Sequence, residues 1–205
     1  DGILITHEHS DHVSGLKVLA TKLGIPIYCN RHTATEIRLI HKCDFKFQLF
    51  ETGHHFEIGD LGVETFPVPH DAREPLQLRC TDGHRTLGVL TDLGHATTHV
   101  LARLAGAHSL LLEFNHDSEL LANSAYPPFL KMRVGGNYGH LSNQAAADIA
   151  RALLHDGLRH VVAAHLSEQN NRPEIVRRLM AQALGGDEAE MLTANAAEGS
   201  PWLDV

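Results

Sequence analysis

The feature that most constrains this chain is a cluster of four ligand-type side chains, His7, His9, Asp11 and His12, in the segment THEHSDH. An apolar run at residues 3–5 precedes the cluster. On an extended exit from a strand, His7 and His9 point to the same side, so both imidazoles can reach one metal ion. A turn into a helix beginning near Asp11 directs Asp11 and His12 toward a second ion. A solvated histidine-rich loop is the alternative, but the spacing favours a metal site.

Three further ligand-type residues each close an apolar run that has the composition of a strand. They are His70 in PVPHDA, Asp92 in TDLGH and His165 in AAHLSEQNN. A carboxylate has two oxygens and can bridge two ions, so we expect Asp92 to be the bridge. His70 then completes the first metal and His165 the second. Taken singly, each residue can equally be an ordinary turn residue at a strand end.

Length and composition indicate one globular domain. The chain has 205 residues, 43% of them hydrophobic and 20% charged, and we expect residues 1–205 to form a single domain. No apolar run approaches the roughly 18 residues that span a bilayer, so we expect no membrane association. Cys29, Cys43 and Cys80 contain no CxxC pair and are interpreted as small buried hydrophobes, which favours a cytosolic location. Seventeen histidines, in contrast, are a heavy load of metal ligands.

The charge balance does not decide the binding partner. Seventeen basic and 25 acidic residues give a formal net charge of −8, whereas proteins that bind nucleic acid non-specifically usually carry a basic face. Bound divalent cations would offset part of this charge inside the site, where a phosphate would lie. Net acidity therefore does not exclude a nucleic acid.

Hydrophobic periodicity predicts strands that alternate with helices around a β-rich centre. Ser10 is the expected N-cap of the first helix, and Asp82-Gly83 is the expected turn of a hairpin. This order predicts a layered α/β fold with helices outside. The expected helices are residues 11–23, 33–41, 96–104, 118–121, 142–155 and 173–184, and the expected strands are residues 3–5, 25–29, 45–50, 56–58, 63–68, 76–81, 86–91, 109–114 and 161–164.

The motif HxHxDH, followed by His70, Asp92 and His165 at strand ends, resembles the metallo-β-lactamase superfamily. More closely, THEHSDHVSGL, PVPHDA, TDLGH, EFNHD, GNYGHLSN and AHLSEQNN resemble its YycJ/WalJ-like branch of phosphodiesterases and nucleases, which is related to RNase Z. The resemblance implies an α/β (α+β) fold, a four-layer αββα sandwich with a binuclear site at its edge. The family's N-terminal strands and GSGSxGN-type turn are absent from this chain, so we expect an N-terminally truncated domain.

Four residues are candidates for substrate contact. His140 in GNYGHLSN precedes a helix whose expected N-cap is Ser142, so a phosphate can meet a histidine and helix-start amides together. A surface capping loop is the alternative, and the assignment to substrate rests mainly on the resemblance. Lys131 and Arg133 lie shortly before His140 and can contact a nucleic acid backbone or be ordinary solvated charges.

The expected chemistry follows from two adjacent cations that share a water. Zinc lowers the pKa of bound water from about 16 to about 7, which makes hydroxide available as the nucleophile. Asp11 or Asp92 can orient or deprotonate this water, and we favour Asp11. His140 is the candidate for protonating the leaving oxygen.

We therefore expect a binuclear metal-dependent hydrolase, a phosphodiesterase or exonuclease acting on DNA or RNA. The alternatives are a small-molecule (cyclic) phosphodiesterase, a thioester or β-lactam hydrolase, and a metal-dependent regulatory binding module without turnover. We expect two divalent ions: His and Asp ligands suit zinc, and an oxygen-rich second site would also accept manganese. The sequence leaves open the metal, the nucleic acid, the cleavage polarity and the oligomeric state.

Overall fold

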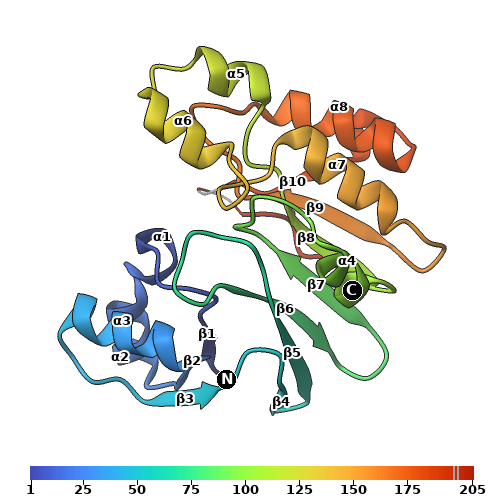
Figure 1. Ribbon diagram of the computed structural model, residues 1–205. Helices are drawn as coiled ribbons and strands as arrows, with labels where there is room; N and C mark the ends of the chain where they lie inside the picture. The colour runs from blue at the N-terminus through green and yellow to red at the C-terminus, as the bar shows by residue number, and fades with distance from the viewer. Residues whose placement is uncertain (196, 198) are drawn as a thin grey trace.

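Two β-sheets packed face to face form the centre of the molecule, and helices cover both outer faces (Figure 1). The computed structural model describes residues 1–195, 197 and 199–205. The smaller sheet is parallel and has the strand order β1-β2-β3. Its strands are β1 (Ile3–Leu4), β2 (Ile27–Asn30) and β3 (Phe47–Phe50).

The larger sheet has the strand order β10-β9-β8-β7-β6-β5-β4. Neighbouring strands are antiparallel from β4 to β7 and parallel from β7 to β10. The carboxyl ends of β7, β8 and β9 therefore meet at one edge of the sheet. The strands are β4 (His55–Ile58), β5 (Leu61–Pro67), β6 (Leu76–Thr81), β7 (Thr86–Leu90), β8 (Ser109–Glu113), β9 (His160–Ala164) and β10 (Leu192–Thr193).

The helices form two outer layers and a separate pair. The first three helices cover the smaller sheet, and α4, α7 and α8 cover the larger one (Figure 1). The pair α5 and α6 lies above α1 in this view. The helices are α1 (Ser10–Val13), α2 (Leu16–Leu23), α3 (Arg31–His41), α4 (Thr98–Leu104), α5 (Ser118–Asn123), α6 (Pro128–Val134), α7 (Asn143–Ala152) and α8 (Pro173–Leu184), and a short 3-10 helix covers Glu188–Glu190.

Three hydrophobic clusters hold these layers together. Val13, Ile27 and Ile37 belong to the cluster between the first helices and the smaller sheet. Val63 and Leu76 belong to the cluster between the sheets, and Phe50 and Leu4 of the smaller sheet pack against it. The largest cluster fills the space between the larger sheet and its helices. This arrangement is the four-layer αββα sandwich that the sequence predicted.

Local sequence signals explain where several elements begin. The Ser142 side chain accepts a hydrogen bond from the Ala145 amide and caps α7, as predicted. Asn30 caps α3 in the same way through the Thr33 amide. The predicted hairpin is also present, because β6 and β7 pair antiparallel with Thr81 opposite Thr86.

The structure differs from the sequence prediction at the first helix. The predicted helix at residues 11–23 is two helices, α1 and α2, which are interrupted at Ser14 and Gly15. Glycine has low helix propensity, and a break at this point lets the chain change direction. Ser10 is not the N-cap. His9 occupies that position without a capping side-chain bond, because its imidazole faces His70 instead.

Three elements were not predicted, namely α6, β10 and the 3-10 helix at Glu188–Glu190. Helix α6 begins at Pro128, at a first-turn position where proline is favoured, but none of its residues is buried. Without a buried face it lacks the apolar periodicity by which helices are recognised in a sequence. Strand β10 has only two residues and exists through its parallel pairing with β9.

Candidate metal centre

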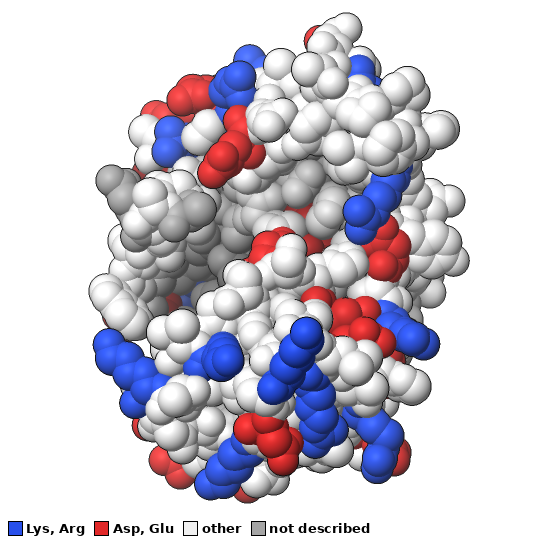
Figure 2. Space-filling view, turned by 90° about the vertical axis from the view of Figure 1, so that its left-hand side faces the viewer, with Lys and Arg blue, Asp and Glu red and all other residues white. Residues whose placement is uncertain are grey.

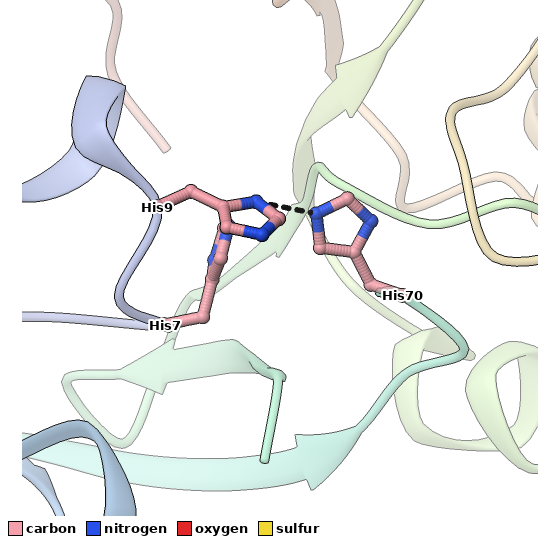
Figure 3. A group of neighbouring side chains, drawn as sticks. All are labelled: His7, His9 and His70. Atoms are coloured by element: carbon pink, nitrogen blue, oxygen red, sulfur yellow. Dashed lines mark hydrogen bonds between the residues drawn. The ribbon is translucent and has the colours of Figure 1, made fainter. Parts of the chain in front are cut away.

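The first group of ligand-type side chains is His7, His9 and His70, whose nearest ring nitrogens all lie within 4.8 Å of one another. The imidazoles converge from two loops, with the dashed line of Figure 3 joining His9 and His70. Nδ1 of His70 donates to the Gly139 carbonyl oxygen at 3.0 Å. This bond leaves the lone pair of Nε2 facing Nδ1 of His9 at 3.2 Å, as two ligands of one cation would be placed.

The second group is Asp11, His12, Asp92 and His165, again within 4.8 Å of one another. Nε2 of His12 lies 3.3 Å from Oδ2 of Asp92. Nε2 of His165 lies 3.4 Å from Oδ2 of Asp11. Asp92 is almost fully buried, whereas the Asp11 side chain is 60% exposed and therefore open to an incoming water or substrate.

Three buried atoms test whether these residues fit metal ions. Nε2 of His7, Nε2 of His12 and Oδ2 of Asp92 have no hydrogen-bond partner among the described residues. A buried polar atom without a partner costs about 1–3 kcal/mol, so three in one place favour a bound ligand. Imidazole nitrogen and carboxylate oxygen are the donors that zinc and manganese accept. The residues fit divalent metal ions.

Glu113, which the sequence prediction missed, holds two of these histidines in place. It is completely buried at the end of β8, and its Oε1 accepts Nδ1–H of both His140, at 2.8 Å, and His165, at 2.7 Å. Oε2 accepts the amides of Leu93 and Leu141. Both imidazoles therefore present Nε2 outward. An acidic residue ending an apolar strand was the available signal, the same signal that identified Asp92.

Burial and neighbouring charges shift the pKa values of the clustered groups. Burial and the nearby His12 lower the pKa of His7 to about 3, which keeps this imidazole neutral as a metal ligand must be. Burial opposes a charge on His165, but hydrogen bonds to Asp11 and Glu113 raise its pKa to about 11. A divalent ion at Nε2 of His165 would replace that proton. Burial also opposes the charge of Asp92, yet His12 and His165 hold its pKa well below the usual range.

Backbone conformation places two of the ligand-type residues. Asp92 and His165 both adopt left-handed backbone conformations, with φ of 53° and 56°. Such a conformation is uncommon outside glycine and costs of order 1–3 kcal/mol. The two residues follow β7 and β9, which flank β8, and the Asp92 side chain contacts His12 while the His165 side chain contacts Glu113. Strain at these positions is typical of functional residues.

Of the candidate substrate residues, His140 lies beside the ligand-type groups. The His140 ring centroid is 5.2 Å from that of His70 and 5.3 Å from that of His165, so His140 lies between the two groups. The Ser142 hydroxyl is used in capping α7. On α6, Lys131 donates to the Ala122 carbonyl oxygen and Arg133 pairs with Asp71.

Figure 2 shows one face of the molecule hollowed between an upper and a lower lobe, with Asp and Glu side chains at the hollow. No helix in the described part of the chain is long and apolar enough to cross a membrane.

An αββα sandwich with His and Asp side chains converging at its edge defines a class, the metal-dependent hydrolases of the metallo-β-lactamase fold. Residues 1–166 match the family described as "Beta-lactamase superfamily domain", and the chain belongs to this superfamily. This match confirms the fold and the enzyme class expected from the sequence.

Relatives agree with the narrower resemblance. The chain is 39% identical to "Exodeoxyribonuclease YycJ" of Bacillus anthracis over 186 residues, which cover 89% of this chain and 70% of the relative. It is 35% identical to "Exodeoxyribonuclease WalJ" of Streptococcus pneumoniae serotype 2 over 188 residues, 90% of this chain and 70% of the relative. Among solved structures, the metallo-beta-lactamase fold protein YhfI from Bacillus subtilis superposes with a TM-score of 0.73 at 19% identity, covering 96% of this chain and 75% of that one.

Proposed function

We propose that this chain is a metal-dependent exonuclease that hydrolyses phosphodiester bonds at the ends of DNA. The convergence of seven ligand-type side chains, several with buried metal-facing atoms that lack hydrogen bonds, carries the proposal. The substrate class is supported by the exodeoxyribonuclease relatives, of which the chain covers 70%. RNA is the alternative polymer. We also propose a cytosolic enzyme, which the three free cysteines support.

Two zinc or manganese ions are the proposed cofactors. His7, His9 and His70 would hold one ion, and Asp11, His12 and His165 would hold the other. Oxygens of Asp92 would serve both. Such a pair supplies hydroxide from water at neutral pH and neutralises the phosphate oxygens.

The protein's own side chains would position the water and move protons. The Asp11 side chain is exposed, so its carboxylate can orient the attacking water and accept its proton. Burial opposes the charge of His140, but Glu113 raises its pKa, which favours a protonated ring. With Nδ1–H bound to Glu113, Nε2 of His140 faces outward to donate a proton to the leaving oxygen.

In this proposal Lys131 and Arg133 attract the nucleic acid backbone near α6. Arg133 is tied to Asp71, beside His70, so it would act as part of a fixed pair. The Ser142 hydroxyl is already used as the cap, and the Asn143 and Ala145 amides are bonded within the protein, so Ser142 would act by fixing the start of α7 beside His140.

A substrate panel tests the proposal. Protein stripped of metal and reloaded with zinc or manganese is incubated with end-labelled DNA and RNA, bis-p-nitrophenyl phosphate, a cyclic nucleotide, a β-lactam and lactoylglutathione. We expect shortening of DNA from its end, and a chelator should abolish it. Rapid hydrolysis of the β-lactam or the thioester with the nucleic acids left intact contradicts the proposal. Metal binding without any turnover would favour a regulatory module.

A further inference from the structure

The short segment between α5 and α7 combines exposed apolar side chains with an unusual charge composition. Phe129, Met132 and Tyr138 are 68%, 72% and 63% exposed. Phe129 and Met132 are three residues apart on α6 and share one face of the helix. No Asp or Glu occurs between Glu119 and Asp148, although the chain as a whole has a net charge of −8. Asp71, from another loop, pairs with Arg133, but the segment itself contributes only positive charge, which is compatible with a polyanion that also has apolar groups.

The positive charge of α6 also favours a polyanionic ligand. Lys131 donates to the Ala122 carbonyl oxygen, so its positive charge has no carboxylate partner among the described residues. Proteins that bind single-stranded nucleic acid combine positive charge along the backbone with aromatic side chains on which bases stack. Lys131 and the exposed side chains of the same helix supply both components.

Tyr138 is exposed on a turn that is fixed rather than mobile. The amide of Gly139 donates to Gly136 at 2.9 Å, and the amide of His140 donates to Val134 at 2.8 Å. His95 donates from Nδ1 to the Asn137 carbonyl oxygen at 2.9 Å. The exposure of the tyrosine ring is thus built into the turn, which reduces the entropy lost when a ligand stacks on it.

The same turn is continuous with the metal centre. The carbonyl oxygen of Gly139, next to Tyr138, accepts the hydrogen bond that orients His70. His140 follows two residues after Tyr138, so the Cα atoms of the two residues are at most about 7.6 Å apart. The backbones of Tyr138 and His140 are thus close enough for a nucleotide whose phosphate reaches His140 to extend its base toward the exposed Tyr138.

We propose that Tyr138, Phe129 and Met132 form a stacking surface that binds the unpaired bases of a DNA end whose phosphate enters the metal centre. This inference rests on the proposed nuclease function. In this proposal, α6 and the turn after it contact the bases, and the metal centre contacts the phosphate.

The test compares two single-stranded oligonucleotides, one ordinary and one with stable tetrahydrofuran abasic residues at its end, using manganese-loaded protein. For Tyr138→Ala we expect KM for the ordinary strand to rise about 5- to 150-fold, the range that stacking gives for one base. KM for the abasic strand should not change. Tyr138→Phe should keep the wild-type preference, because it retains the ring.

Trp202→Ala is the matched control, because Trp202 is a fully exposed aromatic residue outside this surface. It should have wild-type KM values for both strands. If the ratio of KM values for the abasic and the ordinary strand is the same in Tyr138→Ala as in wild type, the stacking surface is contradicted while the nuclease function stands. A wild-type protein that cleaves neither strand overturns the nuclease function, and the stacking surface with it.

Discussion

At the scale of single residues, Glu113 is expected to orient His165, a member of the second ligand group, through the hydrogen bond that its Oε1 accepts. In Glu113→Gln the amide NH₂ must face either the two imidazole Nδ1–H groups or the amides of Leu93 and Leu141, so donors meet donors. We expect ion binding at the group that contains His165 to weaken about 10- to 100-fold, with a fall in kcat. Metal titration with a competing chelator measures the affinity.

Binding at His7, His9 and His70 should change little in this variant, because Glu113 contacts none of them. Glu64→Gln is the control, since that carboxylate pairs with Arg79 and Arg103 away from the metal centre. An equal loss of affinity at both groups would show that Glu113 acts only through general stability.

His140 is expected to separate chemistry from metal binding. The ring lies between the two groups but is proposed to face the substrate, so His140→Ala should retain both ions while kcat falls roughly 10²- to 10⁴-fold. His7→Ala, in contrast, should lose metal as well as activity. Elemental analysis with steady-state kinetics distinguishes the two. Loss of an ion from His140→Ala would make His140 a ligand and contradict the role proposed here.

At the scale of elements, the turn after α6 connects helix packing to the metal centre. A Cβ at Gly139 would lie 2.1 Å from the Arg133 carbonyl oxygen and 2.3 Å from that of Val134, which are backbone atoms that cannot move alone. We expect Gly139→Ala to lower the free energy of unfolding by about 1–3 kcal/mol. Displacement of the turn should also weaken ion binding at His70. Urea unfolding and metal titration measure the two effects.

Gly15→Ala, between α1 and α2, is the matched control for Gly139→Ala. A Cβ at Gly15 meets nothing within 4 Å, and its backbone is right-handed helical. Alanine there should be neutral or raise the free energy of unfolding by up to about 1 kcal/mol. If Gly139→Ala behaves like Gly15→Ala, the turn is not rigidly packed.

At the scale of the whole molecule, bound ions are expected to stabilise the fold. The ligand-type side chains come from both sheets, so an ion held by them joins the two halves of the sandwich in the folded state only. At a free metal concentration 100 times Kd, binding at one site adds about 2.7 kcal/mol. For a chain of this size we expect Tm to rise by about 5–11 °C. A chelator should reverse the rise in a thermal scan, and a Tm independent of metal contradicts a shared site.

Much of the fold and most of the site are predictable because their signals are local in the sequence. The spacing of His7, His9, Asp11 and His12, and an apolar run before His70, are visible without tertiary information. The break between α1 and α2 and the helix α6 were not predicted. The first lies at Ser14 and Gly15, inside an otherwise helical pattern, and the second has no buried face to produce a periodic pattern.

The sequence by itself determined which side chains can bind metal and the layered order of strands and helices, because short-range spacing and periodicity depend only on neighbouring residues. The tertiary structure alone decided how those side chains are oriented. Glu113 bonds to Leu93 and to His165, which is 52 residues away, and Arg133 bonds to Asp71, 62 residues away. The parallel register of β7, β8 and β9 brings Leu93, Glu113 and His165 together at one edge, and the packing of α6 beside the loop after β5 pairs Arg133 with Asp71.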